Sequence, residues 1–174
     1  MKNVLVVLDE KALAYYIQGR ETMQIMSAPT VSVRGQIYHD FQIVHKAGAR
    51  YRLASEKDFD KFKVSFKGYD EDGYHIHAKS PEAKEVRAEI FSRLYEEKEA
   101  QDKLHDRACG AVAEYSHLRG DMGLLPDEVR ESIEYRQVSR ILDQEFQALR
   151  KINGYLSRHY KVEMRKKAIE KRGY

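Results

Sequence analysis

The chain has 174 residues, of which 34% are charged and 42% apolar, with only 3 Pro and 10 Gly. This composition is typical of a globular, helix-rich protein and excludes a disordered or collagen-like chain. The single cysteine, Cys109, excludes an internal disulfide and a cysteine-based zinc site, so we expect a reducing, cytoplasmic setting.

Charge is distributed unevenly along the chain, although the total is only +3. Residues 1–80 carry a net +2 and residues 81–149 a net −6. Residues 150–174 carry a net +7, from nine Lys/Arg and two Asp/Glu. Such segregation indicates either an anionic partner for the C-terminal segment or internal pairing with the acidic segment.

The first part of the chain has the patterns of β-strands. The apolar run Val4–Leu8 is too short to span a membrane and predicts a buried strand. Residues 10–18 fit a short helix by their Ala and Leu content and fit a strand by the run Tyr15-Tyr16-Ile17. Period-two alternation then predicts an antiparallel meander with extended segments at 21–27, 30–34, 37–43 and 51–53.

A short helix and a β-hairpin are expected next. Ser55-Glu56-Lys57-Asp58 has the form of a helix start. The alternation of residues 62–67 and 74–78 around the turn residues Asp70–Gly73 predicts the hairpin. His75 and His77 would share its exposed face, where a third histidine, His39 or His45, could complete a zinc site. Solvated surface histidines are the alternative, and the sequence leaves the choice open.

Long helices are predicted for the second half. Ser80-Pro81-Glu82 is a strong helix start, and apolar residues then recur every three or four positions. Gly120–Gly123 ends this helix, and Pro126 opens a second one that we predict to continue through Asn153-Gly154 to the C-terminus. A short loop between two long helices predicts an antiparallel hairpin. The fold class expected is therefore α+β, with a strand-rich part at 1–79 and a helical hairpin at 80–174.

The C-terminal helix carries the candidate binding site. At 100° per residue, Arg158, Lys161, Arg165 and Arg172 lie within about 60° of one another, opposite the apolar stripe. Tyr155, Tyr160 and Tyr174 could stack on bases or sugars. The alternative is that the basic residues complement the helix dipole and pair with the acidic helices. The anion-binding residues predicted are Arg158, Lys161, Arg165, Lys166, Lys167, Lys171 and Arg172.

Signals for catalysis are sparse. His105-Asp106, followed by His117 and Asp121, resembles the metal-binding His-Asp pair of HD phosphohydrolases in those two residues, which implies a metal-dependent hydrolase. The residues around the pair depart from that family's pattern. Cys109 lies one helical turn after His105, which could activate a thiol, but a small buried thiol is the ordinary explanation. A glycine-rich phosphate loop is absent from the sequence.

The leading hypothesis is a non-enzymatic protein that binds nucleic acid or a nucleoprotein through the basic C-terminal helix, with no cofactor, catalytic residue or resident metal and no membrane contact. The alternative is a protein-interaction or inhibitor module that docks on a larger protein through the sheet and the acidic helix faces. A metal-dependent phosphohydrolase is the third. The interrupted apolar stripe at Glu96–Lys103 also leaves room for a homo-oligomer formed through the helices.

Overall fold

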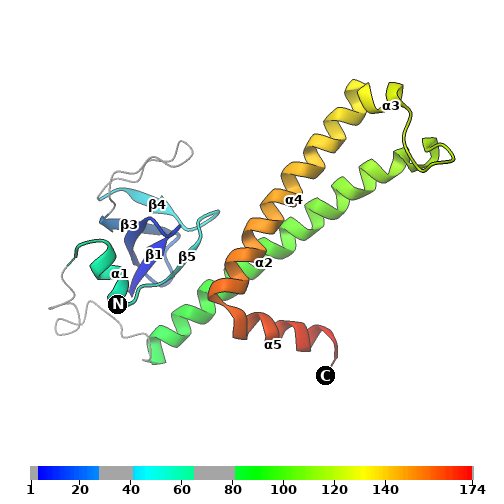
Figure 1. Cartoon of the computed structure of the whole chain (residues 1–174). Helices are drawn as coiled ribbons and strands as arrows, with labels where there is room; N and C mark the ends of the chain where they lie inside the picture. Colours follow the sequence, from blue (N-terminus) through cyan, green and yellow to red (C-terminus); the bar gives the residue numbers. More distant parts are fainter. Residues whose placement is uncertain (1–3, 28–40, 65–80, 174) are drawn as a thin grey trace. The chain divides into compact units, whose positions relative to one another are not determined.

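The computed structural model describes residues 4–27, 41–64 and 81–173. It divides into a first unit, residues 1–93, and a second unit, residues 94–174, which are described separately below. The fold is α+β, with an antiparallel sheet followed by long helices, as the sequence predicts (Figure 1). The predicted boundary at 79/80 stays a prediction, because residues 65–80 lie outside the described ranges.

The first unit contains a five-stranded antiparallel sheet of order β4-β3-β2-β1-β5. Its strands are β1 (Val4–Leu8), β2 (Ala12–Tyr16), β3 (Thr22–Ser27), β4 (Ile43–His45) and β5 (Tyr51–Leu53). The first four strands form an antiparallel meander, and β5 pairs with β1 rather than with β4. Of the predicted extended segments, 21–27 and 51–53 contain β3 and β5, whereas 30–34 and 37–40 lie outside the described residues, and Phe41 lies in a turn with φ 65°. All five residues of β1 are buried, which explains its unbroken apolar sequence.

The segment 10–18, for which helix and strand fitted equally, contains a strand. Asp9 and Glu10 have φ values of 48° and 60°, and Lys11 N–H donates to Leu8 O at 2.9 Å. Two consecutive positive φ values are the geometry of a type I′ turn, which suits the twist of antiparallel strands. The β-branched and aromatic residues on both sides of this turn therefore form a hairpin, with Val4 opposite Tyr16 and Leu8 opposite Ala12.

Both faces of the sheet contribute to the core of the first unit. On one face, Leu5, Val7 and Leu13 pack with Ala54, Phe59 and Phe62. On the other, Tyr16 Oη donates a hydrogen bond of 2.6 Å to Glu89 Oε1 on α2 (Pro81–Ala113), where Ala83, Val86 and Ile90 are buried. The first turns of α2 thus belong to the folded sheet unit.

Helix α1 (Glu56–Lys61) begins as predicted at Ser55, whose N–H and hydroxyl both donate to Asp58 Oδ2. It ends at Phe62, and Lys63 has a φ of 57°. The predicted hairpin strand is therefore wrong for residues 62–64, because tertiary burial uses Phe62 to close the helix. The remainder of that hairpin, with His75 and His77, lies outside the described residues, as does His39.

The second unit is built on an antiparallel pair, α2 and α4 (Ile133–His159), which run side by side in Figure 1. Between them lie the 3₁₀ helix η1 (Glu114–Leu118), a turn at Gly123 with φ 72°, and α3 (Asp127–Glu131). The predicted break at Gly120–Gly123 is confirmed. Helix α4 also runs through Asn153-Gly154 as predicted.

The α2–α4 contact has the spacing of a coiled coil. We call its less exposed inward residues the seam, and they recur at alternating intervals of three and four residues. On the first helix they are Leu94, Lys98, Gln101, His105, Ala108 and Val112 of α2, followed by Tyr115 of η1, and on α4 they are Tyr135, Val138, Leu142, Glu145, Leu149, Ile152 and Leu156. The antiparallel register is fixed by the edge-to-face pair Tyr115–Tyr135, with ring centroids 5.2 Å apart, and by a hydrogen bond from Gln101 Nε2 to the Glu145 carboxylate. A polar pair at such positions specifies one alignment of the helices.

Candidate nucleic-acid interface

The predicted continuous C-terminal helix is divided at Tyr160. This residue has φ −131° and ψ 35°, ends α4 and precedes α5 (Lys161–Lys171). Figure 1 shows α5 turning away from the line of α4. Arg158 therefore stays on the last turn of α4, and the prediction that it shares one helical face with Lys161, Arg165 and Arg172 is wrong, because a wheel of 100° per residue holds only within an unbroken helix.

Contacts at both ends of α5 attach it to the helical hairpin despite the break. Tyr160 is fully buried, its N–H donates to Leu156 O at 2.8 Å, and its carbonyl accepts from Met164 N–H at 2.9 Å. At the far end of α5, Lys171 Nζ lies 2.8 Å from Glu99 Oε1 and 5.5 Å from the ring centroid of Tyr95, both on α2. A buried anchor at one end and an ion pair at the other hold α5 against the hairpin.

Three of the predicted cations share a face of α5. Lys161 and Arg165 on α5, and Arg172, the C-cap residue that directly follows it with helical φ and ψ, lie within about 40° of one another at 100° per residue. All three are exposed, and the side chain of none of them has an ion-pair or hydrogen-bond partner among the residues that the structure describes. We call these three residues the α5 basic face. Val162 and Ile169, 62% and 53% exposed, lie beside it.

Two other predicted cations are paired within the chain. Lys167 Nζ lies 2.9 Å from Glu170 Oε2, and Lys171 pairs with Glu99 as described above. Hydrogen bonds to these carboxylates raise the pKa of both lysines. The pairing expected with the acidic segment 81–149 is therefore found for Lys171, whereas Lys167 pairs within α5 itself. Lys166 is exposed, and its side chain has no such partner among the described residues.

The tyrosines expected to stack on bases are less accessible than the sequence suggested. Tyr160 is fully buried and Tyr155 is half-buried, with its ring centroid 4.6 Å from that of His159. Tyr174 lies outside the described residues. Tyr160 therefore serves as the anchor of α5, and the exposed groups beside the α5 basic face are aliphatic.

The residues proposed for metal chemistry do not converge in the described ranges. His105 lies on the seam with its ring centroid 6.0 Å from that of Phe146, while its Nδ1 is 3.9 Å from Asp106 Oδ1. His117 and Asp121 are exposed, and His117 Nδ1 lies 2.6 Å from the carbonyl of Glu114. Among the described residues, no three His, Cys, Asp or Glu side chains come together as a metal site.

Cys109 is exposed rather than buried, and its Sγ lies 3.7 Å from His105 Nε2. The expectation of a small buried thiol is wrong, because the seam passes through Ala108 and leaves the next residue outside. The two groups are neighbours through their i, i+4 spacing on one helix.

The sheet unit contains a buried lysine that the sequence analysis does not predict. Lys46 is 1% exposed, with Nζ 2.9 Å from Ile17 O and 3.4 Å from the ring centroid of Tyr16. Burial lowers its pKa. These contacts tie the β4–β5 connection to β2 and leave the amine no access to a ligand. In the sequence, Lys46 belongs to a predicted turn, where a lysine is expected to be exposed. Only its position over the ring of Tyr16 shows that it is part of the core.

No protein-family model matches the chain, and comparison with curated proteins and with solved structures gives no significant match. In the described part of the chain, no helix combines the length and apolarity that crossing a membrane requires.

Proposed function

We propose that this protein binds nucleic acid through the α5 basic face, without reading its sequence. The observation that carries the proposal is that Lys161, Arg165 and Arg172 are exposed, share one face and have no acidic partner among the described residues. Cations left unneutralised on a positioned helix release counterions when they meet phosphates, which favours binding to any nucleic acid.

The position of the flanking cations fits the same surface. Lys166 lies on α5, about 100–140° around the helix from the α5 basic face, and Arg158 lies on the last turn of α4, so both add positive charge near α5 without sharing that face. Lys171 links α5 to α2 through Glu99, and Lys167 pairs with Glu170 within α5, so both are already engaged inside the chain. Of the seven predicted residues, five therefore form the proposed contact surface.

A nucleic acid fits α5 better than a lipid surface does. An interfacial membrane helix needs a broad apolar face that can enter the acyl region. On the exposed side of α5 only Val162 and Ile169 are large and apolar, and three cations lie beside them. Two aliphatic side chains can cover sugars or base edges between the phosphate contacts.

The proposal is tested by reversing the three charges of the α5 basic face. We expect the variant Lys161→Glu/Arg165→Glu/Arg172→Glu to bind a labelled oligonucleotide at least about tenfold more weakly at physiological salt, because three phosphate contacts are lost. Fluorescence anisotropy measures the affinity. The matched control is Arg136→Glu/Arg140→Glu/Lys151→Glu, which changes total charge equally at exposed positions of α4.

Equal weakening by both variants would show that total charge, rather than α5, determines binding. Unchanged binding in the α5 variant would remove the proposal. The alternative of docking on a larger protein through the sheet and the acidic helix faces stays a prediction. A partner captured equally well before and after nuclease treatment would favour it.

A further inference from the structure

One face of α2, separate from the seam, carries a mixture of apolar and charged residues. Ala100, Leu104, Arg107 and Ala111 recur every three or four positions on α2 and fall in a sector of about 60°, roughly 110° around the helix from the seam. Glu114, the first residue of η1, follows Ala111 by three positions and continues this row beyond the end of α2. Leu104 is 45% exposed. We call these five residues the lateral face.

Helix α4 extends the apolar part of this face. Leu104 and Ala111 each directly precede a seam residue of α2, and Ile141 and Ala148 each directly precede a seam residue of α4. In an antiparallel coiled coil, the residues that precede the seam on the two helices lie along the same edge of the pair. Ile141 is 48% exposed, so both helices leave aliphatic side chains uncovered along this edge.

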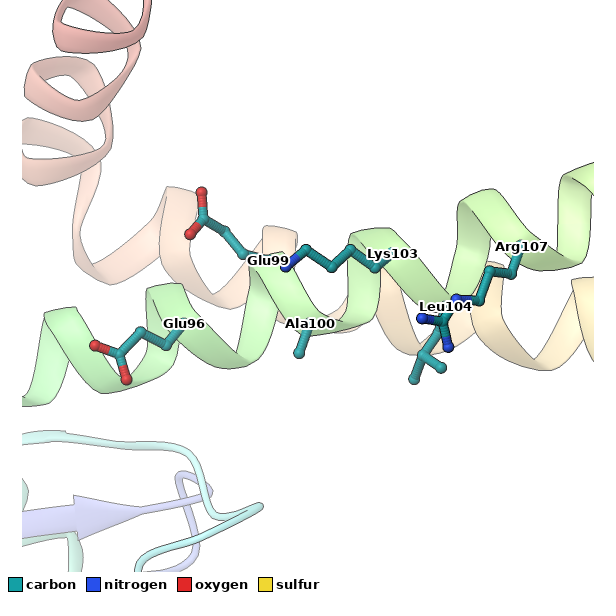
Figure 2. Close-up of a pocket in the computed structure, with 6 residues that line it drawn as sticks. All are labelled: Glu96, Glu99, Ala100, Lys103, Leu104 and Arg107. Atoms are coloured by element: carbon teal, nitrogen blue, oxygen red, sulfur yellow. The ribbon is translucent and has the colours of Figure 1, made fainter.

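The surface of α2 is hollowed along the lateral face. Figure 2 shows a depression lined by Ala100, Leu104 and Arg107, together with Glu96, Glu99 and Lys103. The side chains of Ala100 and Leu104 point to the same side, and the guanidinium of Arg107 lies beside Leu104. All six lining residues belong to one helix, so the depression is too open to enclose a small molecule. A small residue between larger ones is instead a notch that accepts a side chain from another helix.

We propose that the lateral face binds the lateral face of a second copy of this chain. If α2 packs antiparallel against α2 of the second copy about Ala111, each Arg107 lies opposite the other copy's Glu114. Leu104 then lies over residues 117–118, where Leu118 is 40% exposed. Within the described part of the chain, neither Arg107 nor Glu114 uses its side chain in an ion pair, so both charges can be matched across the interface.

The partner inferred for the lateral face is a second copy of the chain, because the charges of this face are complementary to themselves. A two-fold axis requires a patch that is complementary to itself, and Arg107 and Glu114 meet this requirement twice in one arrangement. The product is a four-helix bundle made of two hairpins, in which Ile141 of each copy joins the apolar strip. This association does not depend on nucleic-acid binding by α5.

Charge reversal and rescue test the arrangement in the full chain, freed of nucleic acid and followed by sedimentation velocity over a concentration series. We expect a reversible dimer that Arg107→Glu weakens about tenfold or more, because two carboxylates then face each other at two places. Arg107→Glu/Glu114→Arg should restore it, since the pair is exchanged but still complementary. Arg136→Glu, an exposed reversal on α4, is the matched control and should leave the dimer intact.

The proposal is overturned by a wild-type chain that stays monomeric up to about 100 µM, a concentration at which any dimer with a Kd of that order is detected. It is equally overturned by a dimer that Arg107→Glu does not affect, or by a double variant that does not reassociate. Circular dichroism of each variant, recorded at a concentration at which the protein is monomeric, verifies that the helices are intact.

Discussion

Replacing Arg52 with methionine should lower the free energy of unfolding by about 3–5 kcal/mol at neutral pH, because it leaves a buried carboxylate without its counter-charge. The guanidinium joins β5 to the β1–β2 turn and to α1: Nε lies 2.7 Å from Glu10 Oε1, and Nη2 lies 2.8 Å from Asp58 Oδ1. The Asp58 side chain is only 8% exposed. Denaturant titration followed by circular dichroism measures the loss.

The same variant should change how stability depends on pH. Burial raises the pKa of Asp58, but hydrogen bonds from Arg52 and Ser55 outweigh this and hold it at about 2, below its ordinary 3.8. A carboxyl group whose pKa is lowered in the folded protein stabilises the fold at every pH above its ordinary pKa. This contribution, roughly 2 kcal/mol, is lost as the pH falls from the ordinary pKa toward the pKa of the folded state. Arg52→Met should therefore be much less sensitive to acid over that interval.

The control for Arg52 is Arg50→Met, two residues away, whose backbone N–H but not its side chain bonds Asp9. Its free energy of unfolding should stay within about 0.5 kcal/mol of the wild type. A loss in Arg52→Met no larger than in Arg50→Met would contradict the network described for Arg52, Glu10 and Asp58.

Replacing Leu156 with alanine should lower the free energy of unfolding by about 2–5 kcal/mol, because it opens a cavity at a fully buried position. In the second unit, the buried side chains among those described are few: Leu94, Tyr95, Ala108, Ile152, Leu156 and Tyr160. Leu156 also lies one turn before Tyr160, whose N–H it accepts. Guanidinium denaturation followed by helical circular dichroism measures the effect.

Leu142→Ala is the comparison for Leu156→Ala, since both positions belong to the α4 seam but Leu142 is only half-buried. Its cost should be about 1–2 kcal/mol. Equal losses at the two positions would mean that the outer part of the hairpin is as well packed as its base. Such a result would point to a partner already covering the hairpin under the conditions of the measurement.

The elements with strong local signals were predictable from the sequence. Ser55 before α1 and Pro81 as the first residue of α2 favour a helix start through local chemistry, without tertiary contacts. The glycines after η1 permit the positive φ that the turn at Gly123 requires. Asn153-Gly154 is the converse case: these residues weaken a helix locally, but the apolar stripe on both sides continues in register and α4 passes through them.

The features missed are those that depend on distant residues. The break at Tyr160 lies in the run Ser-Arg-His-Tyr-Lys, which contains neither glycine nor proline, so only the burial of this tyrosine explains it. The strand choice at 12–16 and the crossing of β5 to β1 follow from pairing partners far away in the chain. For the candidate site, the sequence predicts the cations, but it cannot tell which of them meet Glu99 and Glu170 and which stay unpaired.

The most direct measurement of the central claim is the salt dependence of nucleic-acid binding by the wild type and by a neutral variant, Lys161→Gln/Arg165→Gln/Arg172→Gln. Each phosphate contact contributes about 0.9 to the slope of log affinity against log salt on duplex DNA. We predict that the neutral variant has a slope smaller by about 2.7. Identical slopes for the two proteins would contradict the claim that the exposed cations of α5 meet phosphates.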